Sequence, residues 1–315
     1  MGGARVCRPR GRAGRHTSVV AGWDVMKVSV NVTNYSWPGG PSRLPSELRS
    51  FAQASEDGGL EAIWLNDHLL QADPTAAPDE RDMLEAYATL GYLAASTTRL
   101  GLGAMVTAVS YRSPVLLVKA VTTLDVLSGG RAWLGVGAGY PGEAQRLALP
   151  LPPTSERFDL LADTLALARH MWTGQPGPFS GKRLTVPDPE CVPMPVRPGG
   201  VPVLVGGAGE RRTLRLVAEY ADACNLFDIP DEGATLRRKL DVLRRHCDDV
   251  GRDYDTIDRT VSTRLGADES AEEFARRCGA LREWGLTHAV VITPGPWTPD
   301  RLATLATAAR LVADA

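Results

Sequence analysis

A carboxylate and an imidazole stand side by side where a buried strand is predicted to end. Residues 62–65, Ala-Ile-Trp-Leu, lack polar alternation, which is typical of a strand covered on both faces in a parallel sheet. They run directly into Asn66, Asp67 and His68. Parallel α/β proteins bind ligands at this end of the sheet, so Asp67 and His68 are candidates for ligand contact and proton exchange. The alternative is that Asp67 caps a loop and His68 is a hydrogen-bonded interior histidine.

Glycines follow another predicted strand and indicate an anion site. Residues 202–205 lead into Gly206-Gly207-Ala208-Gly209, and a helix is predicted over 211–220. Glycines leave backbone N–H groups uncovered, and the start of a helix attracts a phosphate. We interpret this loop as a phosphate site, with a tight turn alone as the alternative.

The elements that must position these residues are strands alternating with helices. Eight such units in one chain fit a (β/α)8 barrel, whereas a doubly wound sheet rarely has so many. The usual dinucleotide motif after the first strand is also missing. Residues 173–200 are rich in proline and glycine and are predicted to form an insertion between the fourth and fifth units. The predicted strands span 27–31, 62–65, 100–106, 132–136, 202–205, 223–227, 257–265 and 288–293.

Composition sets the broad class of the protein. The chain has 315 residues, a formal net charge of −2, 43% hydrophobic and 23% charged residues, as in a soluble globular protein. Near-neutral charge gives no reason to expect nucleic acid or a membrane surface as partner. No apolar run has the length of a membrane span. Five scattered cysteines without metal-type spacing predict reduced thiols, a cytoplasmic location and no metal site.

The chain is predicted to contain one domain. Residues 1–25 carry five arginines and only one acidic residue, Asp24, so we expect a disordered extension, with a basic arm for some partner as the alternative. Residues 26–315 then form a single barrel domain.

Longer motifs, taken together, resemble the bacterial luciferase-like superfamily and, within it, the coenzyme F420-dependent oxidoreductases. The resemblance spans roughly 27–313 and implies a (β/α)8 barrel of the luciferase type with an insertion after strand four. Its motifs are AIWLNDHLL, LGLGAMVTAVSYRSP, TTLDVLSGGRAWLGVGAGY, ERFDLLADTL and PVLVGGAGERRTLRLVAEYADACNLF.

The resemblance also implies roles for single residues. His68 would lie beside the reactive face of the deazaflavin ring and Asp67 would hydrogen-bond the ring edge. Ala104-Met105 matches a strand bulge where relatives hold a non-proline cis peptide. The residues implied to bind the cofactor are Asp67, Ala104, Met105, Thr107, Ala138, Gly139, Gly206, Gly207 and Ala208.

Two departures from the family pattern direct the functional prediction. The related sugar-phosphate dehydrogenases have a glutamate where this chain has Tyr140, and a tryptophan where it has Ala72. Without that carboxylate, Tyr140 is better suited to donating a proton to a substrate that is being reduced, unless it only packs. We therefore predict an F420-dependent oxidoreductase, with His68 and Tyr140 as catalytic residues, that reduces a C=C or C=N bond rather than oxidising a sugar phosphate.

Other functions remain open at this point. One is an FMN-dependent monooxygenase that receives reduced flavin from a partner reductase. Another is a non-catalytic flavin carrier on the same fold, because a fold alone does not establish activity. The predicted ligand is a small-molecule substrate, and a homodimer is left open. Tyr35, Trp37, Trp64 and Tyr140 suggest aromatic walls around an apolar or conjugated substrate.

Overall fold

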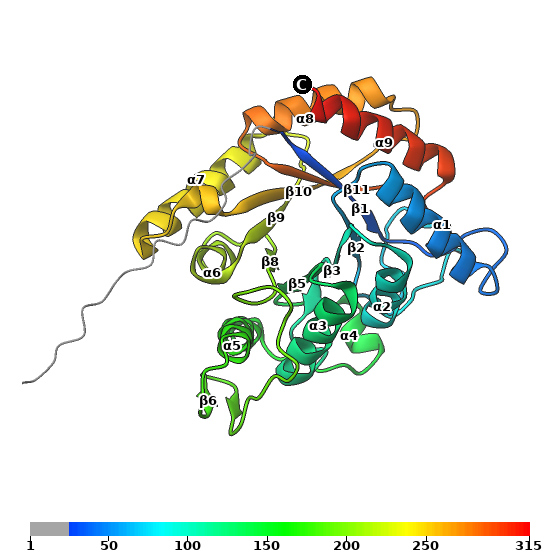
Figure 1. Ribbon diagram of the computed structural model, residues 1–315. Coiled ribbons are helices and arrows are strands. Elements are labelled where there is room, and N and C mark those ends of the chain that lie inside the picture. Colours follow the sequence, from blue (N-terminus) through cyan, green and yellow to red (C-terminus); the bar gives the residue numbers. More distant parts are fainter. Residues whose placement is uncertain (1–24) are drawn as a thin grey trace, which may run out of the picture.

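A computed structural model describes residues 25–315. The predicted N-terminal extension, residues 1–25, lies outside the described residues except for Val25. Parallel strands form a closed barrel with helices outside it (Figure 1). The strands of this sheet are β1 Lys27–Val32, β2 Ala62–Leu65, β3 Gly101–Ala104, β4 Thr107–Ala108, β5 Ala132–Gly137, β8 Val203–Gly206, β9 Ala223–Phe227, β10 Asp258–Arg264 and β11 His288–Ile292.

The pairing order confirms the predicted barrel. The order is β3-β2-β1-β11-β10-β9-β8-β5-β4, and a further pairing of β3 with β5 closes the ring. Strands β3 and β4 are two parts of one barrel strand, so the 9 strands of this sheet make eight barrel strands. All eight carboxyl ends therefore open on one face, as the candidate site requires.

Helices follow the strands and cover the outside of the barrel (Figure 1). Local sequence explains several of their ends: α3 begins at a proline and stops at Gly129 with φ 68°, and Ser270 with Glu273 forms a capping box on α8. None of the helices within residues 25–315 is long and apolar enough to cross a membrane. The helices are α1 Leu44–Asp57, α2 Ala86–Ser96, α3 Pro114–Ser128, α4 Pro141–Arg146, α5 Thr154–Trp172, α6 Thr213–Tyr220, α7 Ala234–Val250, α8 Ala271–Glu283 and α9 Pro299–Ala313.

The predicted insertion lies between α5 and β8. It contains an antiparallel hairpin of β6 Phe179–Ser180 and β7 Thr185–Val186. Asp163 of α5 holds the hairpin turn, because its carboxylate accepts the backbone N–H groups of Lys182 at 3.0 Å, Arg183 at 2.6 Å and Leu184 at 3.1 Å.

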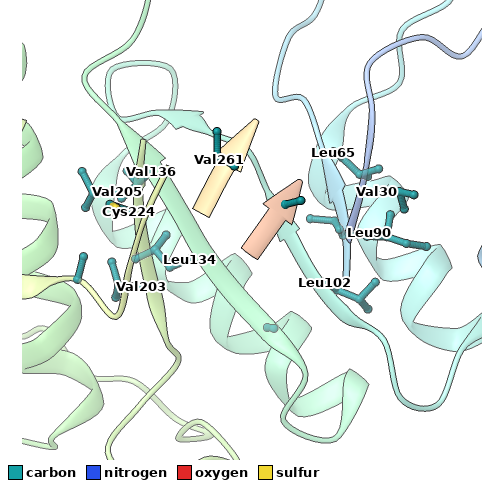
Figure 2. Packing of buried hydrophobic residues seen from close by; sticks show 14 of the residues in the cluster. Val30, Leu65, Leu90, Leu102, Leu134, Val136, Val203, Val205, Cys224 and Val261 are labelled. Atoms are coloured by element: carbon teal, nitrogen blue, oxygen red, sulfur yellow. The ribbon is translucent and has the colours of Figure 1, made fainter. Parts of the chain in front are cut away.

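Alternating strand residues form two apolar layers. Val30, Leu65 and Leu102 belong to the outer layer and gather around Leu90 of α2 (Figure 2). The inner layer fills the barrel with a separate cluster, which consists of Ala62, Trp64, Met105, Leu204, Ala223 and Val290. Successive strand side chains point to opposite faces, so one apolar run supplies both layers.

The third barrel strand is interrupted rather than continuous over 100–106. Strand β3 ends at Ala104, and the cis peptide lies between Met105 and Val106. The prediction of a cis bond between Ala104 and Met105 was therefore wrong by one residue. Met105 N–H still donates to Leu65 O at 2.8 Å, so pairing with β2 continues through Met105 and the break follows it.

A polar cluster fills the opposite, N-terminal end of the barrel. His288 Nε2 lies 2.7 Å from Ser29 Oγ, and its Nδ1 lies 3.3 Å from Asp258 Oδ2. Lys27 Nζ also lies 3.3 Å from that oxygen. Burial alone would raise the pKa of Asp258, but the hydrogen bonds and the charges of His288 and Lys27 outweigh it and hold the pKa well below its usual range.

This cluster gives stability an acid-sensitive component. A carboxyl group whose pKa is lower in the folded than in the unfolded protein stabilises the fold at pH values above its unfolded-state pKa, which is about 3.9 for aspartate. The stabilisation is lost as the pH falls below that value toward the folded-state pKa. Lowering the pH from 5 to 3 should reduce the free energy of unfolding of the Asp258→Asn variant less than that of the unchanged protein. Urea denaturation at the two pH values measures both reductions. The exposed Asp79 supplies the control, Asp79→Asn. An equal loss in Asp258→Asn and the unchanged protein would contradict the assignment.

Candidate active site

Two adjoining cavities lie at the carboxyl ends of the barrel strands. The first, about 680 Å³, is lined from β1, β9, β10 and β11, and the second, about 640 Å³, from the loops after β4 and β5. Both volumes suit a cofactor or a substrate. The residues that line both cavities are His68, Val106, Gly206, Gly207 and Phe227.

Most of the predicted site residues meet here. His68, Gly206 and Gly207 line both cavities, and Met105 lines the first. The predicted residues that line only the second cavity are Asp67, Ala138, Gly139 and Tyr140.

Three predicted cofactor residues line neither cavity. Ala104 and Thr107 are fully buried, and the Thr107 hydroxyl lies 2.8 Å from the Tyr87 hydroxyl. Ala208 is partly buried and packs against the core. These three residues lie behind the cavity walls rather than at the cavity surface.

The glycine loop leaves room that a side chain would fill. A Cβ atom at Gly206 would lie 2.7 Å from Val106 Cγ1, and Gly207 has φ +113°, which L side chains rarely adopt. The loop is less open to an anion than predicted, because Gly207 N–H donates to Asn225 O at 3.3 Å. Helix α6 also begins at Thr213 rather than 211, several residues beyond the glycines.

His68 contacts a carboxylate that sequence reasoning missed. Its Nδ1 lies 3.0 Å from Glu143 Oε1, while Glu143 Oε2 accepts the backbone N–H groups of Leu69 at 2.8 Å and Leu70 at 3.0 Å. The His68 side chain is 30% exposed and that of Glu143 only 6%. Glu143 belongs to α4, which begins directly after Tyr140. A different carboxylate therefore lies beside His68, three residues after Tyr140.

Asp67 is held by an arginine that was also missed. Both of its oxygens accept from Arg112, with Nη2 2.8 Å from Oδ1, and Arg112 also pairs with Glu85. The guanidinium carbon lies 4.9 Å from the centre of the Tyr87 ring. Burial would lower the pKa of Arg112, but Asp67 and Glu85 raise it above its ordinary value. Asp67 lines the second cavity with both oxygens already engaged by a cation.

The predicted aromatic walls are mostly absent from the cavities. Tyr35, Trp37 and Trp64 are 0%, 7% and 1% exposed and pack in the interior, so that interpretation was wrong for them. Tyr140 lines the second cavity and is 65% exposed.

The first cavity is instead rich in hydrogen-bonding side chains. Its arginines have acidic neighbours: Arg277 pairs with Asp228 and Glu269, and Arg264 lies 3.7 Å from Asp73. The buried Asn31 Oδ1 has no hydrogen-bond partner within the described residues. The polar side chains that line this cavity are Asn31, Thr33, Asn66, His68, Asn225, Asp228, Ser262, Thr263, Arg264 and Arg277.

Known proteins resemble this chain in sequence. The F420-dependent glucose-6-phosphate dehydrogenase of Kineococcus radiotolerans is 30% identical over 230 residues, which are 71% of this chain and 65% of that protein. The enzyme of the same name from Nakamurella multipartita is 29% identical over 72% of this chain and 66% of its own length. The chain thus spans about two thirds of the length of these relatives.

Solved structures resemble it in fold. An F420-dependent secondary alcohol dehydrogenase in complex with an F420-acetone adduct superposes with a TM-score of 0.77 at 16% identity, over 91% of this chain and 99% of that one. A monooxygenase from Streptomyces bottropensis gives 0.73 at 16% identity, over 92% and 98%. In sequence, the family model of the luciferase-like monooxygenases matches residues 26–308 of this chain. The chain is therefore a member of the luciferase-like monooxygenase family and has its (β/α)8 barrel.

Proposed function

We propose that the protein is an F420-dependent oxidoreductase in which His68 exchanges a proton with a small polar substrate. The observation that carries this proposal is the His68–Glu143 pair at the junction of the two cavities. A carboxylate-supported imidazole exposed to a ligand cavity is the usual arrangement of a general acid–base. The two relatives described above carry the F420-dependent name, which supports this cofactor.

The residues around the cavities leave room for a flat ring. Met105 and Val106 line the cavities, and glycines at 137, 139, 206 and 207 leave neighbouring loops without side chains. Bound F420 would supply hydride exchange, because its ring has carbon where a flavin has N5. These residues would bind and orient the ring, and His68 would handle the proton.

We propose a different direction of the reaction from the one that the sequence favoured. Reduction of C=C or C=N bonds was favoured because Tyr140 stands where the related dehydrogenases have a glutamate. Glu143 weakens that argument, because it places another carboxylate beside His68. Alcohol oxidation releases a hydride from carbon and a proton from oxygen, and the imidazole of His68 can accept that proton. We therefore propose an alcohol–carbonyl pair as the substrate couple. The polar lining of the first cavity suits such a substrate.

A phosphorylated substrate is less well supported. The two arginines that line the first cavity, Arg264 and Arg277, already lie beside three carboxylates, so no excess of positive charge is offered to a phosphate. Reduction of a C=C or C=N bond remains the second candidate. It is favoured by Tyr140, whose exposed side chain at the second cavity can donate a hydrogen bond.

Cofactor titration tests the proposal. We expect at least tenfold tighter binding of F420 than of FMN, which is about 1.4 kcal/mol. The measurement is fluorescence titration of the purified protein with each cofactor, followed by anaerobic assays against secondary alcohols, enones, imines and sugar phosphates. Tighter binding of FMN, together with oxygen-dependent turnover of reduced FMN, would replace the proposal with a monooxygenase.

A further inference from the structure

We propose that Glu143 is a positioning residue that fixes the tautomer of His68 and leaves Nε2 as the proton acceptor. The kinetic part of this inference rests on the proposed function. The tautomer itself is a property of the protein without cofactor, and it can be tested separately.

The hydrogen bonds determine which nitrogen carries the proton. A carboxylate only accepts hydrogen bonds, so the 3.0 Å contact to Glu143 Oε1 requires the proton on His68 Nδ1. In a neutral imidazole the other nitrogen then has the free lone pair. The Glu143 carboxylate is buried, whereas the His68 ring is partly exposed and lines the cavities. The accepting nitrogen is therefore the one left for a substrate.

Glu143 also holds the chain on which His68 is carried. Its second oxygen accepts both Leu69 N–H and Leu70 N–H, so one side chain orients the ring and the backbone beside it. Burial first, and then the charge of Glu143, raise the pKa of the neighbouring Tyr111 to about 12. Tyr111 thus stays neutral at physiological pH and brings no second negative charge to His68.

Glu143→Gln is a sharp test because it keeps the shape and changes one acceptor into a donor. The two backbone N–H groups require the single amide oxygen, which places the amide NH2 toward His68 Nδ1. Nδ1 must then accept, and the proton moves to Nε2. The variant should therefore invert the tautomer while the fold is retained. Removing the lone pair from Nε2 should also lower turnover, as expected when a base is held in the wrong tautomer.

The first measurement is ¹⁵N NMR of histidine-labelled protein without cofactor. We expect the His68 ring, assigned by loss of its signals in His68→Ala, to show Nδ1–H in the unchanged protein and Nε2–H in Glu143→Gln. The exposed Glu61 supplies the control, Glu61→Gln, which should leave the pattern unchanged. An Nε2–H ring in the unchanged protein, or an unchanged ring in Glu143→Gln, would overturn the proposal.

The second measurement is steady-state turnover of the F420-loaded protein. We expect Glu143→Gln to lower kcat by about 10–10²-fold, less than the loss of the acid–base group itself, with KM changed less than threefold. Glu143→Asp, which keeps the acceptor, should recover part of the rate and retain Nδ1–H. A loss confined to KM, or equal losses in both variants, would make Glu143 merely structural. If no F420 turnover exists at all, the proposed function fails, and the NMR result still decides the tautomer.

Discussion

We expect His68→Ala to lower kcat by about 10²–10⁴-fold, the range of general acid–base catalysis, and to change F420 affinity by less than tenfold. The reason is its place between the cavities: the ring can reach a substrate, while the cofactor has contacts with strand ends and glycine loops that the substitution leaves intact. Steady-state turnover and equilibrium titration measure the two quantities. His170→Ala, in the last turn of α5, is the matched control and should leave both unchanged.

Three results would contradict this role for His68. An unchanged kcat would show that His68 takes no part in the reaction. A loss of affinity as large as the loss of rate would make it a cofactor ligand. A variant that does not fold would favour the alternative that His68 is a structural histidine, although its 30% exposed side chain argues against that.

We expect Arg112→Met to lower the free energy of unfolding by about 3–5 kcal/mol, because it leaves the buried Asp67 carboxylate without its cationic partner. The Asp67 side chain is 1% exposed and that of Arg112 17%, and both oxygens of Asp67 depend on this guanidinium. Urea denaturation at pH 7 measures the loss. In the control, Arg43→Met breaks a pair with Glu47 whose arginine is 62% exposed, and it should cost less than about 1 kcal/mol. A loss in Arg112→Met no larger than in this control would contradict a buried ion pair.

The double variant Asp67→Leu with Arg112→Met separates two roles of Asp67. Removing both charges should restore part of the lost stability, since replacing a buried pair by apolar groups is often neutral. If Asp67 only anchors Arg112, the double variant should bind F420 as tightly as the unchanged protein. If Asp67 hydrogen-bonds the ring edge, as the resemblance implies, the double variant should bind F420 more weakly.

Much of the barrel could be predicted because its signals are local. Strand β2 is a run of four apolar residues, and α3 is bounded by Pro114 and by Gly129 in the left-handed conformation. The insertion was visible as a change of composition before β8. The short helix α4 was not predicted, because its six residues are too few to show a helical period.

The interior of the site was harder to predict because strand residues look alike in sequence. Trp64 was interpreted as a possible cavity wall, yet it lies inside the barrel, 5.7 Å from the Trp133 ring. An apolar run covered on both faces does not show which of its members reach the ligand end. The depth of each residue along the barrel comes from strand register, which only the paired strands define.

The sequence by itself determined the alternation of elements, the placement of Asp67 and His68 at a strand end, and the glycines after the strands. These properties depend on neighbouring residues and on the period of the chain. Only the tertiary structure decided which charges meet there. Arg112 reaches Asp67 across 45 residues and Glu143 reaches His68 across 75. Such contacts form because barrel closure brings successive strand ends to one face, and no local pattern encodes that distance.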